Sequence, residues 1–458
     1  MAKKSRIWNF FDGLKGDKVV WMIVLMLIMC SAVCIFSSTS TTKEVLNGTK
    51  TRVDVVLDLV KIIIIGIALM LVCYNFIGVK GYRRLARLGF AASAAMLVVV
   101  VGHLNFGSFF QAGQINGAWR VIKIGGLQLH IYEVIKVAMI MYLAWAVDAF
   151  QHKDFKMLNF LSGKEHFKWM KKPGWQKVIM IYFPMFFVMG MVAMGSGSSA
   201  AFIGLLMFIT ILVGGLSVKE LIKPALALVL IIVGVILIDR VSDGRLLENT
   251  RAATWVSRFK GSGDAEQDFR EAEPKSVEYF AALDKLRQPY SAKIAIKQGG
   301  LFGKGAGQST QRYIVPVMYE DYMFSFIVEE YGLLGALFVI ILYVSLLARG
   351  SLIVRNCKDN FGKITVAGLV LLISGQAMMH MLINSGIGPL TGQTLPLISY
   401  GSSSFIVFCI AFGIILSISR EAERKIESET RNAEPLKMVR EGIQGDLDAL
   451  DVFESEIE

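Results

Sequence analysis

The chain has 458 residues, of which 54% are hydrophobic and only 19% are charged. Its mean hydropathy is +0.54, and the apolar residues come in long blocks. This combination excludes a secreted disulfide module, a disordered chain and an ordinary soluble enzyme, because none of them carries so many apolar blocks with so little charge. The five cysteines show neither metal-ligand spacing nor a disulfide framework. We therefore predict an all-α polytopic membrane protein.

The apolar blocks predict about ten transmembrane helices, because a spanning helix needs about 20 mostly apolar residues. No small-residue cleavage site follows the first block, so we do not expect it to be a signal peptide. The predicted spans are residues 19–36, 57–79, 88–104, 127–147, 178–194, 200–216, 224–238, 322–347, 364–387 and 401–418.

Lysine and arginine are concentrated in alternate loops, and in membrane proteins the cytoplasmic loops carry this excess. The basic loops share a side with residues 1–18, so we expect both termini in the cytoplasm, with 419–458 as a flexible tail. The same bias explains the net charge of +11 without nucleic acid. Within the membrane domain, 19–418, residues 239–321 then form the one long extracytoplasmic loop, between spans 7 and 8.

Three stretches of this long loop differ in character. Residues 261–273 are rich in Gly, Ser and acidic residues, and we expect them to be flexible. Residues 291–298 are expected to form a short amphipathic element at the membrane surface. The glycine-dense run 299–309 does not fit the phosphate-binding pattern Gly-x-x-x-x-Gly-Lys-Ser/Thr, and no strand–helix unit surrounds it. We expect a structural loop whose backbone could approach an anionic lipid headgroup.

Charged side chains inside the predicted spans point to a functional site. Glu133 and Lys136 lie three residues apart, so they can pair on one helix face. Each charge costs about 2.5–3.5 kcal/mol at the centre of a spanning helix on insertion scales, so such residues face the protein interior. A purely structural pair near the interface is the alternative. Residues 384–404 contain prolines and glycines that break the helix, which is tolerated where backbone lines a cavity.

Several motifs resemble those of the SEDS family (shape, elongation, division and sporulation). Residues 395–403 resemble its Pro-Leu-x-Ser-Tyr-Gly-Gly-Ser-Ser signature, and residues 116–120 its Gly-Ala-x-Arg-Trp motif. Glu133 and Lys136 match the end of its Gln-Pro-Ser-Glu-x-x-Lys motif. Further matches cover residues 294–309 and 316–332, and residues 15–18 and 391–394 resemble the division members more than the elongation members.

The resemblance implies a peptidoglycan glycosyltransferase that polymerises lipid II at the outer face of the bacterial cytoplasmic membrane. For a division member it also implies a place at the septum, a class B penicillin-binding protein as partner, and contacts with other divisome proteins and membrane lipid. We expect no organic cofactor, and the cofactor that we consider is a divalent cation, Mg²⁺ or Mn²⁺.

The chemistry that this reaction requires suggests which residues act. A sugar hydroxyl is a weak nucleophile, so a carboxylate base should contribute about 10²–10⁴-fold. The family's loop motif aligns through Gln288, which makes Asp284 the expected base, with Asp268 and Asp264 as alternatives. Arg120 is expected to stabilise the leaving diphosphate. The complete set of expected substrate-binding residues is Arg120, Glu133, Lys136, Arg52, Gln288, Lys304, Asp321, Ser399 and Tyr400.

Two other functions compete with this one. A lipid II flippase would need a polar path between both membrane faces, whereas the charges within the predicted spans gather in the outer half. A non-catalytic divisome scaffold would need no base at all. Polymerisation of lipid II by the purified chain with its partner separates these readings.

Overall fold

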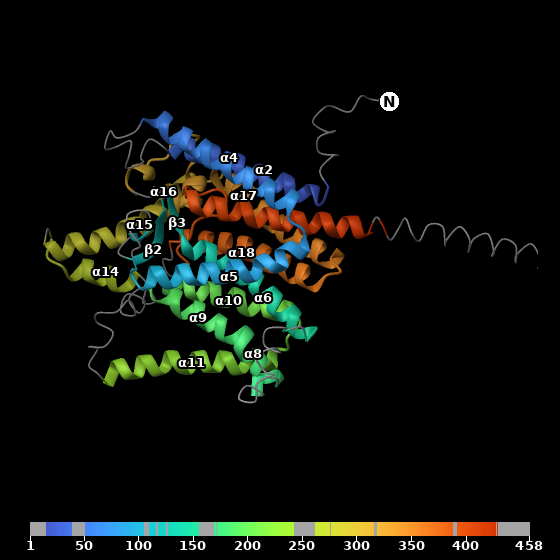
Figure 1. Cartoon of the computed structure of the whole chain (residues 1–458). Helices are drawn as coiled ribbons and strands as arrows, with labels where there is room; N and C mark the ends of the chain where they lie inside the picture. The colour runs from blue at the N-terminus through green and yellow to red at the C-terminus, as the bar shows by residue number, and fades with distance from the viewer. Residues whose placement is uncertain are drawn as a thin grey trace, which may run out of the picture.

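The structure is a computed structural model, and its helices run side by side in one elongated bundle (Figure 1). It describes residues 15–38, 51–104, 110–115, 118–124, 127–153, 155, 169–170, 172–241, 262–274, 276–315, 318–387, 392–426 and 428.

The long helices follow the apolar blocks of the sequence. Among the described residues, seven helices are long and apolar enough to cross a membrane, and α10 is a shorter apolar helix. The predicted helical membrane class is thereby confirmed, while the count of ten spans stays a prediction. The seven are α2 (Lys18–Ser38), α4 (Arg52–Phe76), α5 (Val79–Val101), the continuous stretch of α8 (Pro173–Lys177), the π-helix η3 (Val178–Tyr182) and α9 (Phe183–Ala193), then α17 (Met323–Asn356), α18 (Asn360–Asn384) and Ser402–Ile426. The other helices of the bundle are α6 (Ile131–Gln151), α10 (Gly197–Val213) and α11 (Val218–Val241).

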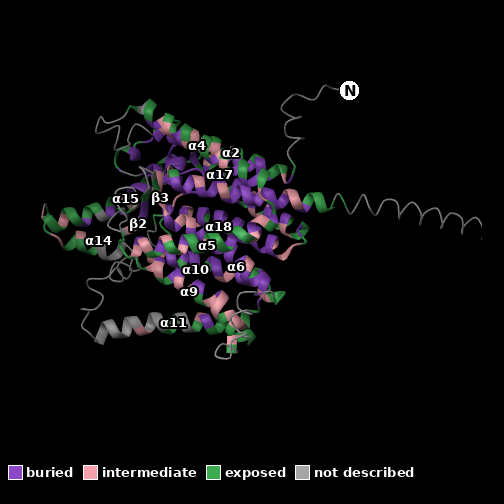
Figure 2. Cartoon of the chain, viewed as in Figure 1, coloured by how far each residue is buried: buried purple, intermediate pink, exposed green. Residues whose placement is uncertain are grey.

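The burial pattern separates a central layer from a lipid-facing layer (Figure 2). Helix α6, most of α18 and the helix Ser402–Ile426 are buried along most of their length. By contrast, α4 exposes large apolar side chains such as Leu57, Ile64 and Phe76. An apolar face of that extent is costly in water but favourable against lipid tails, so α4 lies at the periphery of the bundle.

A small antiparallel sheet lies between α5 and α6, and the sequence did not lead us to expect it. Its strands are β1 (Phe110–Ile115), β2 (Ala118–Ile124) and β3 (Leu127–His130), in the order β1-β2-β3. The start of the fourth predicted span was wrong: Leu127 pairs with Ile124 in the sheet, and the helix begins only at Ile131. A strand can form here because the backbone groups of β3 that face β2 are paired with that strand.

The long loop between α11 and α17 is largely helical where it is described. Helices α14 (Ser262–Glu271) and α15 (Val277–Gly299) extend from one end of the bundle (Figure 1). The expected flexible stretch 261–273 is therefore wrong from Ser262 to Glu271. Residues 291–298 are not a separate surface element either, because they continue α15, which packs against α17. The short helices η4 (Gln311–Tyr313) and α16 (Met318–Asp321) follow.

At the opposite end, the segment before α2 is fixed to the ends of other helices. The Asp17 carboxylate accepts from Arg349 at 2.7 Å, and its backbone N–H donates to Ser419 Oγ at 3.0 Å. Arg83 bridges the carboxylates of Asp148 and Asp359, each at 2.8 Å. The start of α2 and the last helix therefore meet at the same end of the bundle, away from the sheet.

Candidate functional site

The end of the bundle that carries the sheet gathers polar side chains from segments far apart in the sequence. Strand β2 packs against α5 and α6. The His130 N–H donates to Ser403 Oγ at 2.9 Å, which joins the end of β3 to the last helix. The Tyr400 N–H donates to the Tyr319 carbonyl at 3.0 Å, and the two rings form an edge-to-face pair 5.6 Å apart. These contacts bring β2, β3, α16 and residues 392–404 together around one site.

Arg120 and Asp321 bring opposite charges to this site. Arg120 comes from β2, is half-buried, and donates to the Gly195 carbonyl at 3.4 Å. Burial raises the pKa of Asp321, and the positive charge of Arg120 opposes that rise. The Asp321 carboxylate also lies against Gly392, where a Cβ would come within 3.7 Å of it; Gly392 adopts φ +58°, which favours glycine. The loop thus approaches the carboxylate closely.

His130 lies beside this pair, at the junction of β3 and α6. Burial lowers its pKa, Arg120 and Lys136 lower it further, and Glu133 opposes them. These surroundings favour the neutral imidazole over the imidazolium, relative to a histidine in water. A neutral ring can accept or donate one hydrogen bond without adding charge to the site.

The Glu133–Lys136 pair predicted from the sequence is present, and Lys136 is almost completely buried. Its ammonium donates to Glu133 Oε1 at 2.7 Å, to Gln376 Oε1 at 2.6 Å and to Gln393 Oε1 at 3.1 Å. An ammonium has three N–H donors, so all of them are directed at acceptors of this chain. Lys136 therefore joins three segments of the fold. The other carboxylate oxygen of Glu133, Oε2, is buried and has no hydrogen-bond partner.

Sequence reasoning missed the residues of α18 that complete this network. Gln376, His380 and Asn384 are all buried. His380 Nδ1 is 2.6 Å from the Gln393 carbonyl, and Asn384 Nδ2 donates to the Asp321 carbonyl at 3.1 Å. Their spacing of four residues places them on one helix face, so a search for polar residues at helical spacing within the apolar block could have found them.

Two of the predicted binding residues serve the fold through contacts within the chain. Lys304 Nζ donates to Glu329 Oε1 at 2.6 Å, to Thr310 Oγ1 at 2.8 Å and to Gln298 Oε1 at 2.5 Å, so its three donors are directed at this chain. Ser399 Oγ donates to the Glu320 carbonyl at 2.7 Å and accepts from the Leu395 N–H.

The predicted base Asp284 lies on α15, and its two alternatives lie on α14. Arg52 is the first residue of α4. Asp284 is exposed in the first half of α15, and Gln288 follows it one turn later, half-buried. Asp268 is exposed on α14, which also contains Asp264. The side chains of Asp264 and Arg52 lie outside the described residues. Asp284 and Arg120 therefore belong to different elements, with α15 extending outward and β2 at the end of the bundle.

The arrangement suits recognition of a phosphate group near the membrane surface. Arg120 supplies planar N–H donors that match phosphate oxygens. Among the described residues, no group of three or more His, Cys, Asp or Glu side chains is placed to hold a metal ion. A divalent cation could still be held by Asp321 together with phosphate oxygens of a substrate, since Mg²⁺ is commonly bound by one or two carboxylates plus phosphates.

Comparisons with known proteins agree with the predicted SEDS resemblance. Residues 17–424 match the family described as cell cycle protein, which groups FtsW, RodA and SpoVE. The FtsW of Bacillus subtilis, named a probable peptidoglycan glycosyltransferase, is 30% identical over 344 residues, or 74% of this chain and 76% of that one. The Escherichia coli K12 protein MrdB, named a peptidoglycan glycosyltransferase, is 38% identical over 141 residues, which are 30% of this chain and 38% of its own length.

Solved structures share the fold at low sequence identity. One, reported as structural coordination of polymerization and crosslinking by a peptidoglycan synthase complex, matches with a TM-score of 0.58 at 19% identity over 89% of this chain and 98% of the other. The crystal structure of Thermus thermophilus RodA matches with a TM-score of 0.54 at 19% identity, covering 90% and 99%. With the family match over most of its length, this multi-pass membrane protein belongs to the FtsW, RodA and SpoVE family of cell cycle proteins.

Proposed function

We propose that this chain is a peptidoglycan glycosyltransferase that polymerises lipid II at the outer face of the cytoplasmic membrane during cell division. The proposal is carried by Arg120 on β2 and Asp321 on α16, which bring opposite charges to the end of the bundle that carries the sheet, in a chain whose FtsW relative is named a probable peptidoglycan glycosyltransferase. A lipid diphosphate lies at the level of the headgroups, and the predicted topology puts Arg120 at that level.

The reaction joins two sugars and releases a lipid diphosphate. A sugar hydroxyl attacks the anomeric carbon of a second lipid-linked sugar, the bond from that carbon to the phosphate oxygen breaks, and the diphosphate leaves with the bonding electrons. We assign stabilisation of this leaving group to Arg120, because a donor aimed at developing charge contributes more in the transition state than in the ground state. Asp321 keeps Arg120 oriented and is the residue that could hold a divalent cation.

We assign the base to Asp284 on physical grounds. The sugars of lipid II extend outward from the diphosphate, so the base must stand farther from the membrane than Arg120. Helix α15 extends outward from the bundle and exposes Asp284 (Figure 1). An acid next to Arg120, such as Asp321, lies at the level of the diphosphate instead. Asp284 takes the proton of the attacking hydroxyl as the new bond forms.

The interior of the bundle supports the alternative function, transport of lipid II across the membrane, less well than it supports the glycosyltransferase. Between Lys136 and Asp148, the buried residues of α6 are aliphatic side chains, two methionines and one tyrosine. A polar headgroup would need polar partners along that length, because unpaired polar groups are costly in the membrane interior. The polar network around Lys136 stays in the outer part of α6.

We propose a class B penicillin-binding protein and other divisome proteins as partners, a septal location, and both termini in the cytoplasm. The synthase complex whose fold this chain shares is reported to coordinate polymerization and crosslinking, which is the reason for expecting a crosslinking partner. The contact of Asp17 with Arg349 and Ser419 supports two termini on the same side.

The test is glycan synthesis by the full chain, co-purified with its penicillin-binding partner and supplied with fluorescent lipid II. We expect glycan strands from the wild type, none from Asp284→Asn, and wild-type amounts from Asp268→Asn and Asp264→Asn, because the amide retains shape and lacks basicity. If the wild type makes no glycan, the proposed function is wrong. If Asp268→Asn or Asp264→Asn alone is inactive, the base has been misassigned within the loop.

A further inference from the structure

The glycine-dense segment that joins α15 to α16 is built into a break in helix α17. Gly332 interrupts α17 with φ 68° and ψ −169°. The N–H groups of Lys304 and Gly305 donate to the carbonyls of Glu329 and Glu330, both at 2.9 Å. In return, the Leu333 N–H donates to the Gly300 carbonyl at 2.9 Å. We call residues 299–313 together with Glu329–Gly332 the glycine joint.

Glycine is required where the two backbones meet. A Cβ on Gly303 would collide with the carbonyl oxygen of Glu330, and a Cβ on Gly299 would collide with that of Val328. Gly303 also has φ +79°, a conformation that L side chains rarely adopt. The segment that could be mistaken for a phosphate cradle therefore holds the backbone of the chain's own α17.

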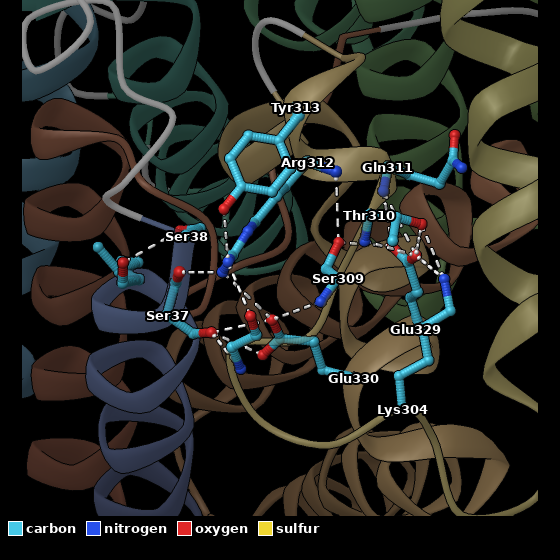
Figure 3. A network of polar contacts seen from close by, with 12 residues as sticks. Ser37, Ser38, Lys304, Ser309, Thr310, Gln311, Arg312, Tyr313, Glu329 and Glu330 are labelled. Atoms are coloured by element: carbon cyan, nitrogen blue, oxygen red, sulfur yellow. Dashed lines mark hydrogen bonds and ion pairs between the residues drawn. The ribbon is translucent and has the colours of Figure 1, made fainter.

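The Glu329 carboxylate is fully buried and bound on both oxygens (Figure 3). Oε1 accepts from Lys304 Nζ at 2.6 Å and from the Thr310 N–H at 3.0 Å. Oε2 accepts from Ser309 Oγ at 2.5 Å. A buried charge held by this many donors fixes the groups around it, because moving any one of them leaves a charged group under-satisfied.

The adjacent Glu330 carboxylate ties the same segment to α2. It accepts from Ser37 Oγ at 2.7 Å and lies 3.7 Å from Arg312 Nη1. Arg312 in turn donates to the Ser37 carbonyl at 2.8 Å and to the Gly307 carbonyl at 2.7 Å. Figure 3 shows both glutamates pointing into the segment. The glycine joint thus fixes three elements at the outer end of the bundle: α2, α15 and α17.

The glycine joint is close in sequence to both proposed carboxylates. Asp284 precedes residues 299–313 on α15, and Asp321, at the end of α16, lies between those residues and Glu329. Helix α15 packs on α17 beside the joint, so the joint sets the direction in which α15 extends. We propose that Glu329 and Glu330 are positioning residues that hold Asp284 and Asp321 in the geometry required for glycan synthesis. This proposal rests on the proposed function.

The test separates positioning from binding. Glu329→Gln and Glu330→Gln keep side-chain shape and remove the charge that organises the joint. We expect kcat to fall by about 10- to 100-fold, because a misplacement of about 1 Å costs roughly 10²-fold, with the KM for lipid II changing little. Glu220→Gln is the matched control, since Glu220 forms an ion pair with Lys177 away from the joint. It should leave kcat and KM at wild-type values.

A distance measurement reads out the position of α15 without catalysis. Spin labels at Glu278→Cys on α15 and Ser385→Cys at the end of α18 are both at exposed positions. We expect their distance distribution to broaden in Glu329→Gln and to stay narrow in Glu220→Gln. If Glu329→Gln does not fold, Lys304→Gln serves instead. The Lys304 side chain is 24% exposed, and without it the backbone N–H groups that donate to the Glu329 carboxylate remain in place.

The outcomes distinguish this proposal from the proposed function. An inactive wild type overturns the function itself. An active wild type together with wild-type kcat in Glu329→Gln and Glu330→Gln overturns the positioning role alone. A distance distribution between the spin labels that stays narrow in Glu329→Gln also overturns the positioning role, even if kcat falls.

Discussion

The buried ammonium of Lys136 offers a sharp test of the interior network. Lys136→Met keeps the length and apolar stem of the side chain and removes its charge and three donors. The variant leaves the carboxylate of Glu133, and the amide oxygens of Gln376 and Gln393, without their shared partner. The Glu133 side chain is only 14% exposed, so water can replace the lost ammonium in part but not in full.

The expected cost follows from these contacts. Removing one partner of a buried ion pair costs about 3–5 kcal/mol in soluble proteins. Hydrogen bonds between membrane helices are weaker, about 0.6 kcal/mol on average and about 1.7 kcal/mol at most. Because Glu133 is partly hydrated, we expect Lys136→Met to lower the free energy of unfolding by roughly 2–4 kcal/mol. That is about a 30- to 800-fold change in the unfolding equilibrium.

The assay is reversible unfolding in mixed detergent micelles, with a double-mutant cycle that adds Glu133→Gln. The double variant removes the orphaned charge, so it should recover roughly 1–2 kcal/mol of the loss. The control is Lys61→Met, because Lys61 pairs with Asp58 at the same three-residue spacing but is 71% exposed. The control should stay within about 0.5 kcal/mol of the wild type. A Lys136→Met variant as stable as this control would refute the reasoning.

Three further predictions concern the outer face. Arg120→Lys should lose most lipid II polymerisation while the protein stays folded, because an ammonium lacks the planar donors that bind phosphate oxygens in pairs; wild-type synthesis by this variant would remove Arg120 from the site. Because burial raises the pKa of Asp321, its carboxylate ionises only as pH rises through that raised value, so activity should be lost on acidification at a higher pH than an ordinary aspartate would give. In the residual activity of Asp321→Asn this limb should lie at lower pH, because only the proposed base must still be ionised, and an unchanged limb would assign it to another group. A cysteine at Ser262 should react with a membrane-impermeant thiol reagent on intact spheroplasts, whereas protection there would invert the predicted topology.

The sequence by itself determined the class of this protein and one ion pair of its candidate site. Long apolar blocks predict helices in a membrane because backbone polar groups there must bond within the segment. The Glu133–Lys136 pair could also be predicted from the sequence, since residues three apart on a helix are neighbours whatever surrounds them. The family motifs suggested Arg120 and Asp321 as candidates, but not that the charge of Arg120 acts on Asp321.

The tertiary structure decided the contacts between distant segments. Lys136 is separated from Gln376 by 240 residues, and no local pattern could indicate that these side chains meet. Strands β1, β2 and β3 are short, and their stability depends on pairing with one another, so apolar periodicity extended the helix through Leu127. We expected the glycine-dense segment to be a structural loop whose backbone could approach an anionic lipid headgroup, because glycine permits close approach. What approaches it is the backbone of α17 and the carboxylates of Glu329 and Glu330, which only the folded chain brings there.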